Sequence, residues 1–328
     1  MNWRVYLLII PALLTVAVGF SLAANDATVT LECTAVPTAP QCPSGTSGGL
    51  LISPTDTRKD RTTKRTLSFE DVDSSFKEVM VFRRDRAPAF KQVTWTTAET
   101  LAFNSGHEEL PLRIWAICTD EQGTCPALTA TQQKTLGEKM VAHANSILTR
   151  ERTGIKLVPP ADGTLISDES GTPALTVHKT VTSCEVFKQK AVGANKFAAG
   201  ALNIYIVNKV EVNGKSETSN ACSNFMDAAV VGAKASSYLI LHEIGHMLAL
   251  DHVNETASDW GSDPKENFMK DSSVTRKFFT EGQIFRMHLD KTSAINVLFN
   301  RHPGDQRWCE SSPVLPCPEL HERVWEEP

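Results

Sequence analysis

Features that are missing from the sequence exclude some classes of function. The chain has no long block of lysine and arginine: 33 basic and 38 acidic residues are interspersed over 328 positions, which gives a net charge of −5. Proteins that bind nucleic acid through its phosphate backbone need a concentrated positive surface. We therefore expect no nucleic-acid partner.

A second absence concerns the membrane. After the first residues, no apolar run is long enough to cross a bilayer. At the start of the chain, Arg4 precedes an apolar run from Val5 to Phe20, and small residues follow. This order predicts a secretory signal peptide at residues 1–23, and Pro11 argues against an uncleaved anchor. We expect a protein that is secreted, or periplasmic in a Gram-negative host, without stable membrane association.

Cysteine pairs with C-x-x-C spacing are also missing, which disfavours a cysteine-bound zinc finger. All eight cysteines follow the predicted signal peptide, and an even number in an exported chain favours disulfides. Many connectivities remain open. Order along the sequence suggests Cys33–Cys42, Cys118–Cys125, Cys184–Cys222 and Cys309–Cys317.

One stretch of the sequence carries the chemistry. On a helix, His242 and His246 lie one turn apart on the same face, so both imidazoles can reach one metal ion. Their apolar neighbours predict a buried helix, where unpaired histidines would be costly. If the chain turns back near Ala249, His252 completes a three-nitrogen zinc site with an open fourth position, which is typical of catalytic zinc. The alternative is a helix with two surface histidines.

The run His242-Glu243-x-x-His246-x-x-Ala249-x-x-His252 resembles the H-E-x-x-H-x-x-G-x-x-H signature of metzincin zinc peptidases. The resemblance implies that the three histidines bind one catalytic Zn²⁺ and that Glu243 is the general base. Ala249 replaces the glycine of the signature, and a positive φ at this position would cost about 1 kcal/mol.

Metzincins also have a Met-turn after the third histidine, and residues 267–271 resemble it. By this resemblance, Met269 lies beneath the metal as a hydrophobic floor. No tyrosine follows Met269, so the tyrosine ligand of astacin-like and serralysin-like enzymes is not expected. Residues 250–252 are similar to matrixins, and the strand before the helix is similar to bacterial pappalysins, but neither feature assigns a subfamily.

The resemblance implies an α+β fold: a twisted, mainly parallel sheet with an antiparallel edge strand, a long backing helix, an active-site helix and a smaller C-terminal subdomain with a final helix. Residue patterns agree with such a domain at 107–302. A capping box at Thr280–Gln283 predicts the final helix, through about Phe299. The other predicted elements are strands at 110–118, 155–158, 177–186 and 201–210, a helix at 129–150, and an active-site helix that begins near Ser237 after a serine cap. We expect residues 201–207 to form the edge strand that pairs with extended substrate.

Residues 24–106 are predicted as an N-terminal extension or propeptide, and residues 303–328 as a disulfide-containing tail. Ser, Thr, Pro and Gly are common at 25–64, which predicts a flexible or loosely stapled segment, and short strands are expected at 78–82 and 91–97. Some metzincins are latent because a propeptide cysteine binds the zinc. For Cys33 and Cys42, a local disulfide is favoured over such a switch.

The predicted function is a zinc endopeptidase that acts on protein or peptide substrates. The alternatives are a catalytically silent binding protein, a zinc hydrolase of another substrate class, or a gluzincin in which Glu266 replaces His252 as a ligand. Asp259 and Asp263 lie in a segment where Ca²⁺ could bind, although a solvated turn is favoured. The sequence does not predict the oligomeric state.

Overall fold

The computed structural model describes the chain in separate stretches. These are seven strands before residue 103 and residues 107–117, 130–169, 181–207, 209–217, 219–224, 226–253, 266–271 and 276–298. The predicted signal peptide and C-terminal tail lie outside the described residues, as do six of the eight cysteines. Among the described helices, none is both long enough and apolar enough to span a bilayer.

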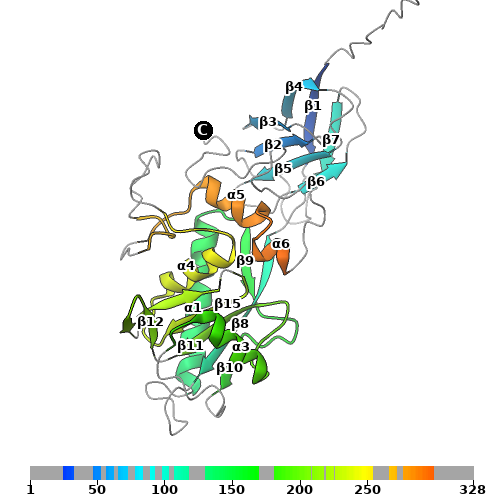
Figure 1. The fold of residues 1–328 in the computed structure, drawn as a ribbon. Coiled ribbons are helices and arrows are strands. Elements are labelled where there is room, and N and C mark those ends of the chain that lie inside the picture. Colours follow the sequence, from blue (N-terminus) through cyan, green and yellow to red (C-terminus); the bar gives the residue numbers. More distant parts are fainter. Residues whose placement is uncertain are drawn as a thin grey trace, which may run out of the picture.

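The described backbone before residue 103 forms two small sheets, with strand orders β4-β1-β7 and β3-β2-β5-β6, and neither shares a strand with the main sheet (Figure 1). The prediction of a flexible or loosely stapled segment at 25–64 missed β1, β2 and β3, which lie there. The strand at 78–82 is confirmed. The strand expected at 91–97 overlaps β6 only at its first residues, and 93–97 lie outside the described residues. The strands are β1 (Asn25–Glu32), β2 (Ser47–Ile52), β3 (Thr57–Thr62), β4 (Thr66–Val72), β5 (Glu78–Arg83), β6 (Ala89–Gln92) and β7 (Ala98–Ala102).

The main sheet is mostly parallel and has the order β10-β8-β11-β15-β14, with β9 also paired to β8. Only β14 runs antiparallel, against β15. The predicted α+β class, with a mainly parallel sheet and an antiparallel edge strand, is therefore compatible with this fold. The strands are β8 (Glu108–Ile117), β9 (Ile155–Val158), β10 (Ile166–Glu169), β11 (Leu202–Val207), β14 (Ala221–Ser223) and β15 (Ala228–Gly232); β12 (Val210–Val212) and β13 (Lys215–Glu217) form a separate hairpin.

The prediction that residues 201–207 form the edge strand is wrong. Residues 202–207 form β11, which lies between β8 and β15 in the middle of the sheet. The alternating pattern suggested a strand with one solvent-facing side, but every residue of β11 is buried. Asn203, for example, accepts a hydrogen bond from the Trp115 indole and donates to backbone carbonyls, so its amide is satisfied inside the protein. The antiparallel edge strand is instead β14.

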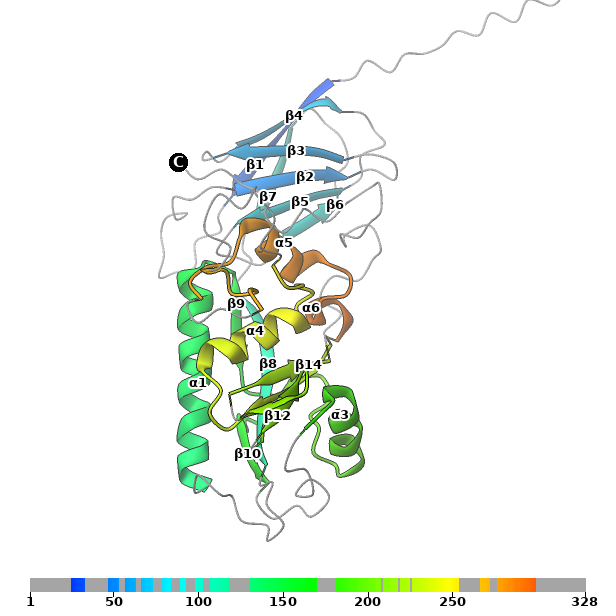
Figure 2. The ribbon, with the colours of Figure 1, turned by 60° about the vertical axis from the view of Figure 1, so that its left-hand side comes forward.

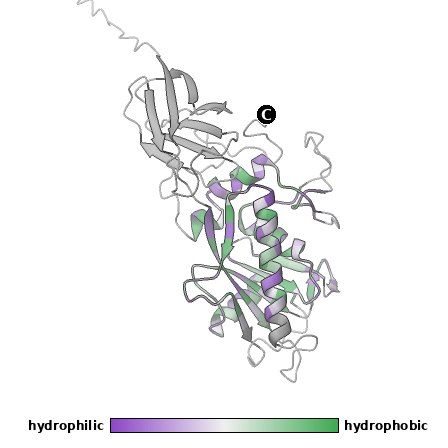
Figure 3. Cartoon of the chain, turned by 180° about the vertical axis from the view of Figure 1, so that it is seen from behind, coloured by the Kyte–Doolittle hydropathy of each residue, from purple (hydrophilic) through white to green (hydrophobic). Residues whose placement is uncertain are grey.

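Helices cover both faces of this sheet (Figure 2). On one face, Leu202, Ile204 and Ile206 pack in a core with apolar residues of α1 (Ala130–Arg150) and α4 (Ser237–Met247). On the other face, Tyr205 and Val207 pack against α3 (Cys184–Gly193). Figure 3 shows hydrophobic residues along the central strands and polar residues on the outward side of α1. The predicted helix at 129–150 is therefore confirmed, and its buried apolar residues belong to the core on one face of the sheet.

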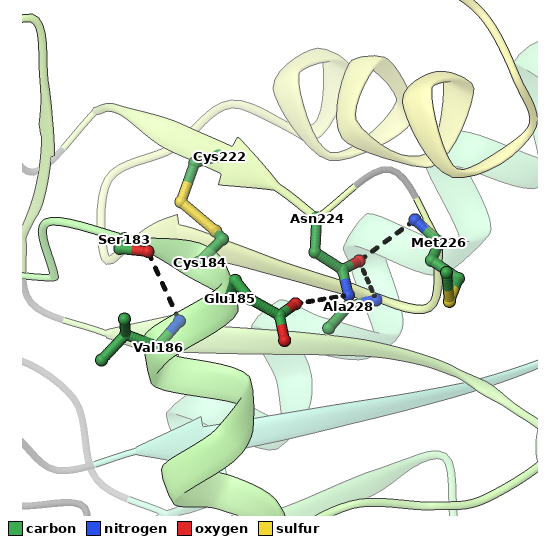
Figure 4. The surroundings of a disulfide bond; sticks show 8 residues. All are labelled: Ser183, Cys184, Glu185, Val186, Cys222, Asn224, Met226 and Ala228. Carbon is green, nitrogen blue, oxygen red and sulfur yellow. Dashed lines mark hydrogen bonds between the residues drawn. A yellow bond between two sulfur atoms is a disulfide. The ribbon is translucent and has the colours of Figure 1, made fainter.

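Helix α3 corrects another prediction. Residues 177–186 were expected as a strand because Val and Thr favour extended structure; of these, 177–180 lie outside the described residues. The Ser183 hydroxyl instead accepts a hydrogen bond from the Val186 amide and caps a helix, and Phe187 is buried against the sheet. The predicted disulfide Cys184–Cys222 is confirmed and joins α3 to the edge strand β14 (Figure 4). The other three predicted disulfides lie outside the described residues.

The C-terminal part contains α5 (Glu281–Leu289) and α6 (Ala294–Val297). The capping box of Thr280 and Gln283 is confirmed. The single helix predicted through Phe299 is wrong, because Asp290 is extended and α5 ends there. Two side chains stabilise the break: the Ser293 hydroxyl donates to the Met287 carbonyl, and the Asn296 amide donates to the carbonyls of His288 and Asp290.

Candidate metal centre

Helix α4 carries the first half of the site. It lies between the main sheet and α5 (Figure 1). Its N-terminus is capped as predicted, by the Ser236 hydroxyl, which accepts a hydrogen bond from the Leu239 amide at 3.3 Å. Every residue from Ile240 to Met247 is buried. His242 and His246 therefore lie one turn apart on a rigid, solvent-excluded helix.

The chain leaves α4 through a left-handed turn at Ala249, where φ is +66°. The Ala249 amide donates to the His246 carbonyl, and the Leu250 amide donates to the Gly245 carbonyl, as in a Schellman C-cap. Glycine is favoured at this position because it has no Cβ. Alanine nevertheless makes the turn, and the turn brings His252 back toward the helix.

The three predicted histidines converge. Their Nε2 atoms are 3.1 Å apart for His242 and His246, 3.1 Å for His246 and His252, and 3.2 Å for His242 and His252. On the other side of two rings, Nδ1 of His242 donates to the Phe268 carbonyl and Nδ1 of His246 donates to the Leu250 carbonyl. Because these carbonyls only accept hydrogen bonds, each ring has its proton on Nδ1 and an Nε2 lone pair that faces the others.

Burial keeps the two helical imidazoles neutral. It lowers the pKa of His242 well below its usual range and the pKa of His246 to about 4. Converging lone pairs of neutral rings repel one another unless a cation lies between them. Among the described residues, this is the one group of three histidine, cysteine, aspartate or glutamate side chains that could hold a metal ion.

Glu243 lies beside this cluster. Its side chain is buried, and burial raises the pKa of its carboxyl to about 8, an effect that Arg276 opposes and Asp271 reinforces. A carboxyl group with a pKa near neutrality can both accept and release a proton at physiological pH.

Met269 packs directly against α4. A Cβ atom built on Gly245 would collide with Sδ of Met269 and lie 3.1 Å from its Cε, so only glycine leaves space for this side chain. The Met269 carbonyl also accepts a hydrogen bond from the Val253 amide at 3.0 Å, which fixes the chain next to His252. Met269 therefore connects the helix with the segment that returns to it.

A buried amide pair holds the turn that contains Met269. The Asn267 and Gln283 side chains exchange two hydrogen bonds of 2.9 Å, and Oδ1 of Asn267 also accepts from the Met269 amide. Gln283 is the same residue that completes the capping box of α5. Helix α5 thus fixes the turn beneath the site.

Several residues at or near the site were not predicted from the sequence. Arg276 comes from a segment with no recognisable motif. Asp271 lies in the predicted Met-turn and Gln283 in the predicted capping box, but neither was assigned a role near the site; Gly245 could have been found because it lies directly before His246. Glu266 forms an ion pair with Lys277 at 2.6 Å and does not belong to the three-histidine cluster, so the gluzincin alternative finds no support. The residues considered for Ca²⁺ lie outside the described residues.

Comparison with known proteins gives no further assignment. No protein-family model matches the chain, and no curated protein is significantly similar to it.

Proposed function

We propose that the protein is a secreted zinc-dependent endopeptidase of the metzincin type. The observation that carries this proposal is the convergence of three Nε2 lone pairs next to a buried glutamate. A tetrahedral zinc ion with Zn–N bonds of about 2.0–2.1 Å needs nitrogen atoms roughly 3.3–3.4 Å apart. The separations of 3.1–3.2 Å among the three histidines fit this requirement.

The open side of the cluster favours catalysis over a structural role. The side chain of His252 is 47% exposed, whereas His242 and His246 are buried, so solvent or substrate can approach from the His252 side. A zinc ion held by three imidazoles supplies a Lewis acid that polarises the peptide carbonyl and lowers the pKa of water toward about 7.

The residues of the chain account for the remaining steps. Glu243 accepts a proton from the attacking water and then delivers it to the leaving amine. The Nδ1 hydrogen bonds of His242 and His246 hold their rings in one tautomer and orientation. Met269 fills the space beneath the cluster and excludes water from that side.

Strand β14 is the best candidate to align the substrate. It is the antiparallel edge strand of the main sheet and is covalently joined to α3 by the Cys184–Cys222 disulfide. An extended peptide can add to such an edge through backbone hydrogen bonds, so many sequences can be accepted. The disulfide also agrees with an oxidising compartment, as expected of a secreted protein.

The test is cleavage of a denatured protein by the purified secreted form, with and without a zinc chelator. We expect the chelator to abolish cleavage and Glu243→Gln to lower the rate roughly 10²- to 10⁴-fold while one zinc per chain is retained. Glu138→Gln, an exposed glutamate on α1, is the matched control and should keep full activity.

If the intact chain binds zinc but does not cleave, the assay is repeated after removal of residues up to about 64–86, which tests whether the N-terminal region confers latency. A trimmed, zinc-loaded protein that is still inactive would contradict the peptidase and leave a binding protein with the same metal centre. Full activity of Glu243→Gln would remove the glutamate from the mechanism.

A further inference from the structure

Asp271 lies on the metal side of the third histidine. Its Oδ1 atom is 3.9 Å from Nε2 of His252, which is the nitrogen atom that faces the other two histidines. Both side chains are exposed, at 70% for Asp271 and 47% for His252. The carboxylate therefore lies on the open side of the cluster, from which solvent or substrate approaches.

Backbone contacts fix this arrangement. The Met269 carbonyl accepts a hydrogen bond from the Val253 amide at 3.0 Å, which joins the segments that carry the histidine and the carboxylate. Nη2 of the buried Arg276 donates to the carbonyls of Lys270 at 3.0 Å and Asp271 at 3.4 Å. The backbone of Asp271 is thus held beside the third histidine, whereas its exposed side chain can change rotamer without leaving a packed site.

A bound metal ion changes what this contact can be. When Nε2 of His252 binds a metal, it carries no proton, so it cannot donate a hydrogen bond to the Asp271 carboxylate. A nitrogen lone pair and a carboxylate oxygen repel each other unless a cation lies near both. The cation that the three histidines would hold is therefore the group that attracts this carboxylate.

The separation is close to that of two ligands on one ion. With bonds of about 2.0–2.2 Å to nitrogen and oxygen, two ligands of a tetrahedral zinc ion lie roughly 3.4 Å apart. The distance of 3.9 Å between Oδ1 of Asp271 and Nε2 of His252 is longer, and Asp271 is not one of the residues whose ligand atoms already converge. Rotation of the exposed Asp271 side chain toward the cluster would close the difference.

We infer that Asp271 is a fourth, displaceable protein ligand, which occupies the open position of the metal centre when no substrate is bound. This inference rests on the metal centre of the proposed function. Carboxylate oxygen is an ordinary zinc ligand, and an anionic ligand offsets part of the charge that three neutral imidazoles leave uncompensated. Because its side chain is exposed and mobile, Asp271 gives way to water or substrate at this position.

Asp251 provides a matched control. It is also an exposed aspartate, and it directly precedes His252 in the sequence. Asp271→Asn and Asp251→Asn each remove one negative charge near the metal centre, but only Asp271→Asn removes the inferred ligand. Comparing the two variants therefore separates coordination from attraction through space.

The test measures metal binding rather than cleavage. Each purified protein is titrated with zinc against a chromogenic chelator. Each is also loaded with Co²⁺, whose visible absorption bands report the number and kind of its ligands. For Asp271→Asn we expect zinc affinity to fall roughly 10-fold and the Co²⁺ bands to shift. Asp271→Glu keeps the carboxylate and should lose less affinity.

Asp251→Asn should change zinc affinity by less than about 2-fold, because solvent screens an exposed charge, and should leave the Co²⁺ bands unchanged. Thermal unfolding of the metal-free proteins checks that all variants fold. Asp271→Ala gives the same comparison if Asp271→Asn does not fold.

Three results would overturn the inference. Wild-type affinity and wild-type Co²⁺ bands in Asp271→Asn would show that Asp271 is a solvated surface carboxylate. A loss of affinity without a shift of the bands would place the carboxylate outside the coordination sphere. An equal loss in Asp251→Asn would show that only its charge matters.

Failure of the peptidase proposal is a separate result. A wild-type protein that binds metal as expected for these variants but cleaves nothing supports the inference and contradicts only the peptidase. A wild-type protein that binds neither Zn²⁺ nor Co²⁺ overturns both.

Discussion

The two histidines on α4 and the histidine beyond it are held in different ways. His242 and His246 are buried on a capped helix, and each ring is fixed by a hydrogen bond to a backbone carbonyl. His252 is exposed, lies beyond a left-handed turn and depends on contacts between Val253 and Met269. The helix supplies a preformed half-site, whereas tertiary contacts supply the third ligand.

This difference indicates which part of the histidine cluster is most easily disturbed by mutation. A helical ligand is positioned by local hydrogen bonds that form together with the helix. The third ligand is positioned only once residues 266–271 have packed against α4. Disturbing this packing should affect His252 before it affects His242 or His246.

The largest expected effect comes from removing ligands one at a time. His246→Ala should weaken zinc binding roughly 100-fold or more, because a preorganised buried ligand is lost and water cannot readily replace it. His252→Ala should weaken binding less, because water can occupy the exposed position. Competition with a chromogenic zinc chelator measures both affinities.

Glu266→Ala is the control for this comparison and should leave zinc affinity unchanged, because Glu266 pairs with Lys277 outside the cluster. Equal losses of zinc affinity in His246→Ala and His252→Ala would show that His252 is as preorganised as the two histidines on α4.

A smaller effect is expected from filling the space between α4 and Met269. Gly245→Ala adds a methyl group that collides with Sδ of Met269. The strain should outweigh the gain in helix propensity and lower the free energy of unfolding of the metal-free protein by about 1–2 kcal/mol. Urea denaturation measures the change.

Gly193→Ala is the matched control, because a Cβ at this end of α3 meets nothing within 4 Å. It should be neutral or slightly stabilising. If both variants had the same free energy of unfolding, the close contact between Met269 and Gly245 would not contribute to stability.

The smallest effect is expected at the turn itself. Ala249→Gly should raise the free energy of unfolding by about 1 kcal/mol, because glycine adopts φ of +66° without strain. In the exposed, regular part of α1, Ala142→Gly should have the opposite sign and cost about 1 kcal/mol. Thermal unfolding of both variants and of wild type measures these changes in stability. If Ala249→Gly did not stabilise the protein, the positive φ of Ala249 would not be a source of strain.

Elements encoded by local chemistry were predictable. The serine cap of α4, the capping box of α5 and the apolar stripe of α1 depend on residues close together in sequence, and the structure contains all three. Predictions failed where distant contacts decide the outcome. Residues 184–186 favour a strand locally, but the Ser183 cap and the burial of Phe187 under the sheet stabilise a helix.

The same distinction applies to the place of a strand in a sheet. The pattern of residues 202–207 predicts a strand, but alternation does not show what covers its second face. Helix α3 covers that face, so β11 is central and the short strand β14, with too few residues to give a pattern, forms the edge. The seven N-terminal strands were largely missed for a related reason, since a composition rich in Ser, Thr, Pro and Gly favours loops.

By itself, the sequence determined which residues could bind a metal, because H-E-x-x-H spacing fixes two ligands on one turn of a helix and His252 follows at a suitable distance. Only the tertiary structure decided that His252 reaches the other two, that Met269 packs beneath Gly245, and that the Arg276 side chain is buried. The physical reason is the range of the interactions. Helical spacing and caps act over a few residues, whereas convergence of the third ligand and burial of a distant charge require segments up to about 34 positions apart to pack together.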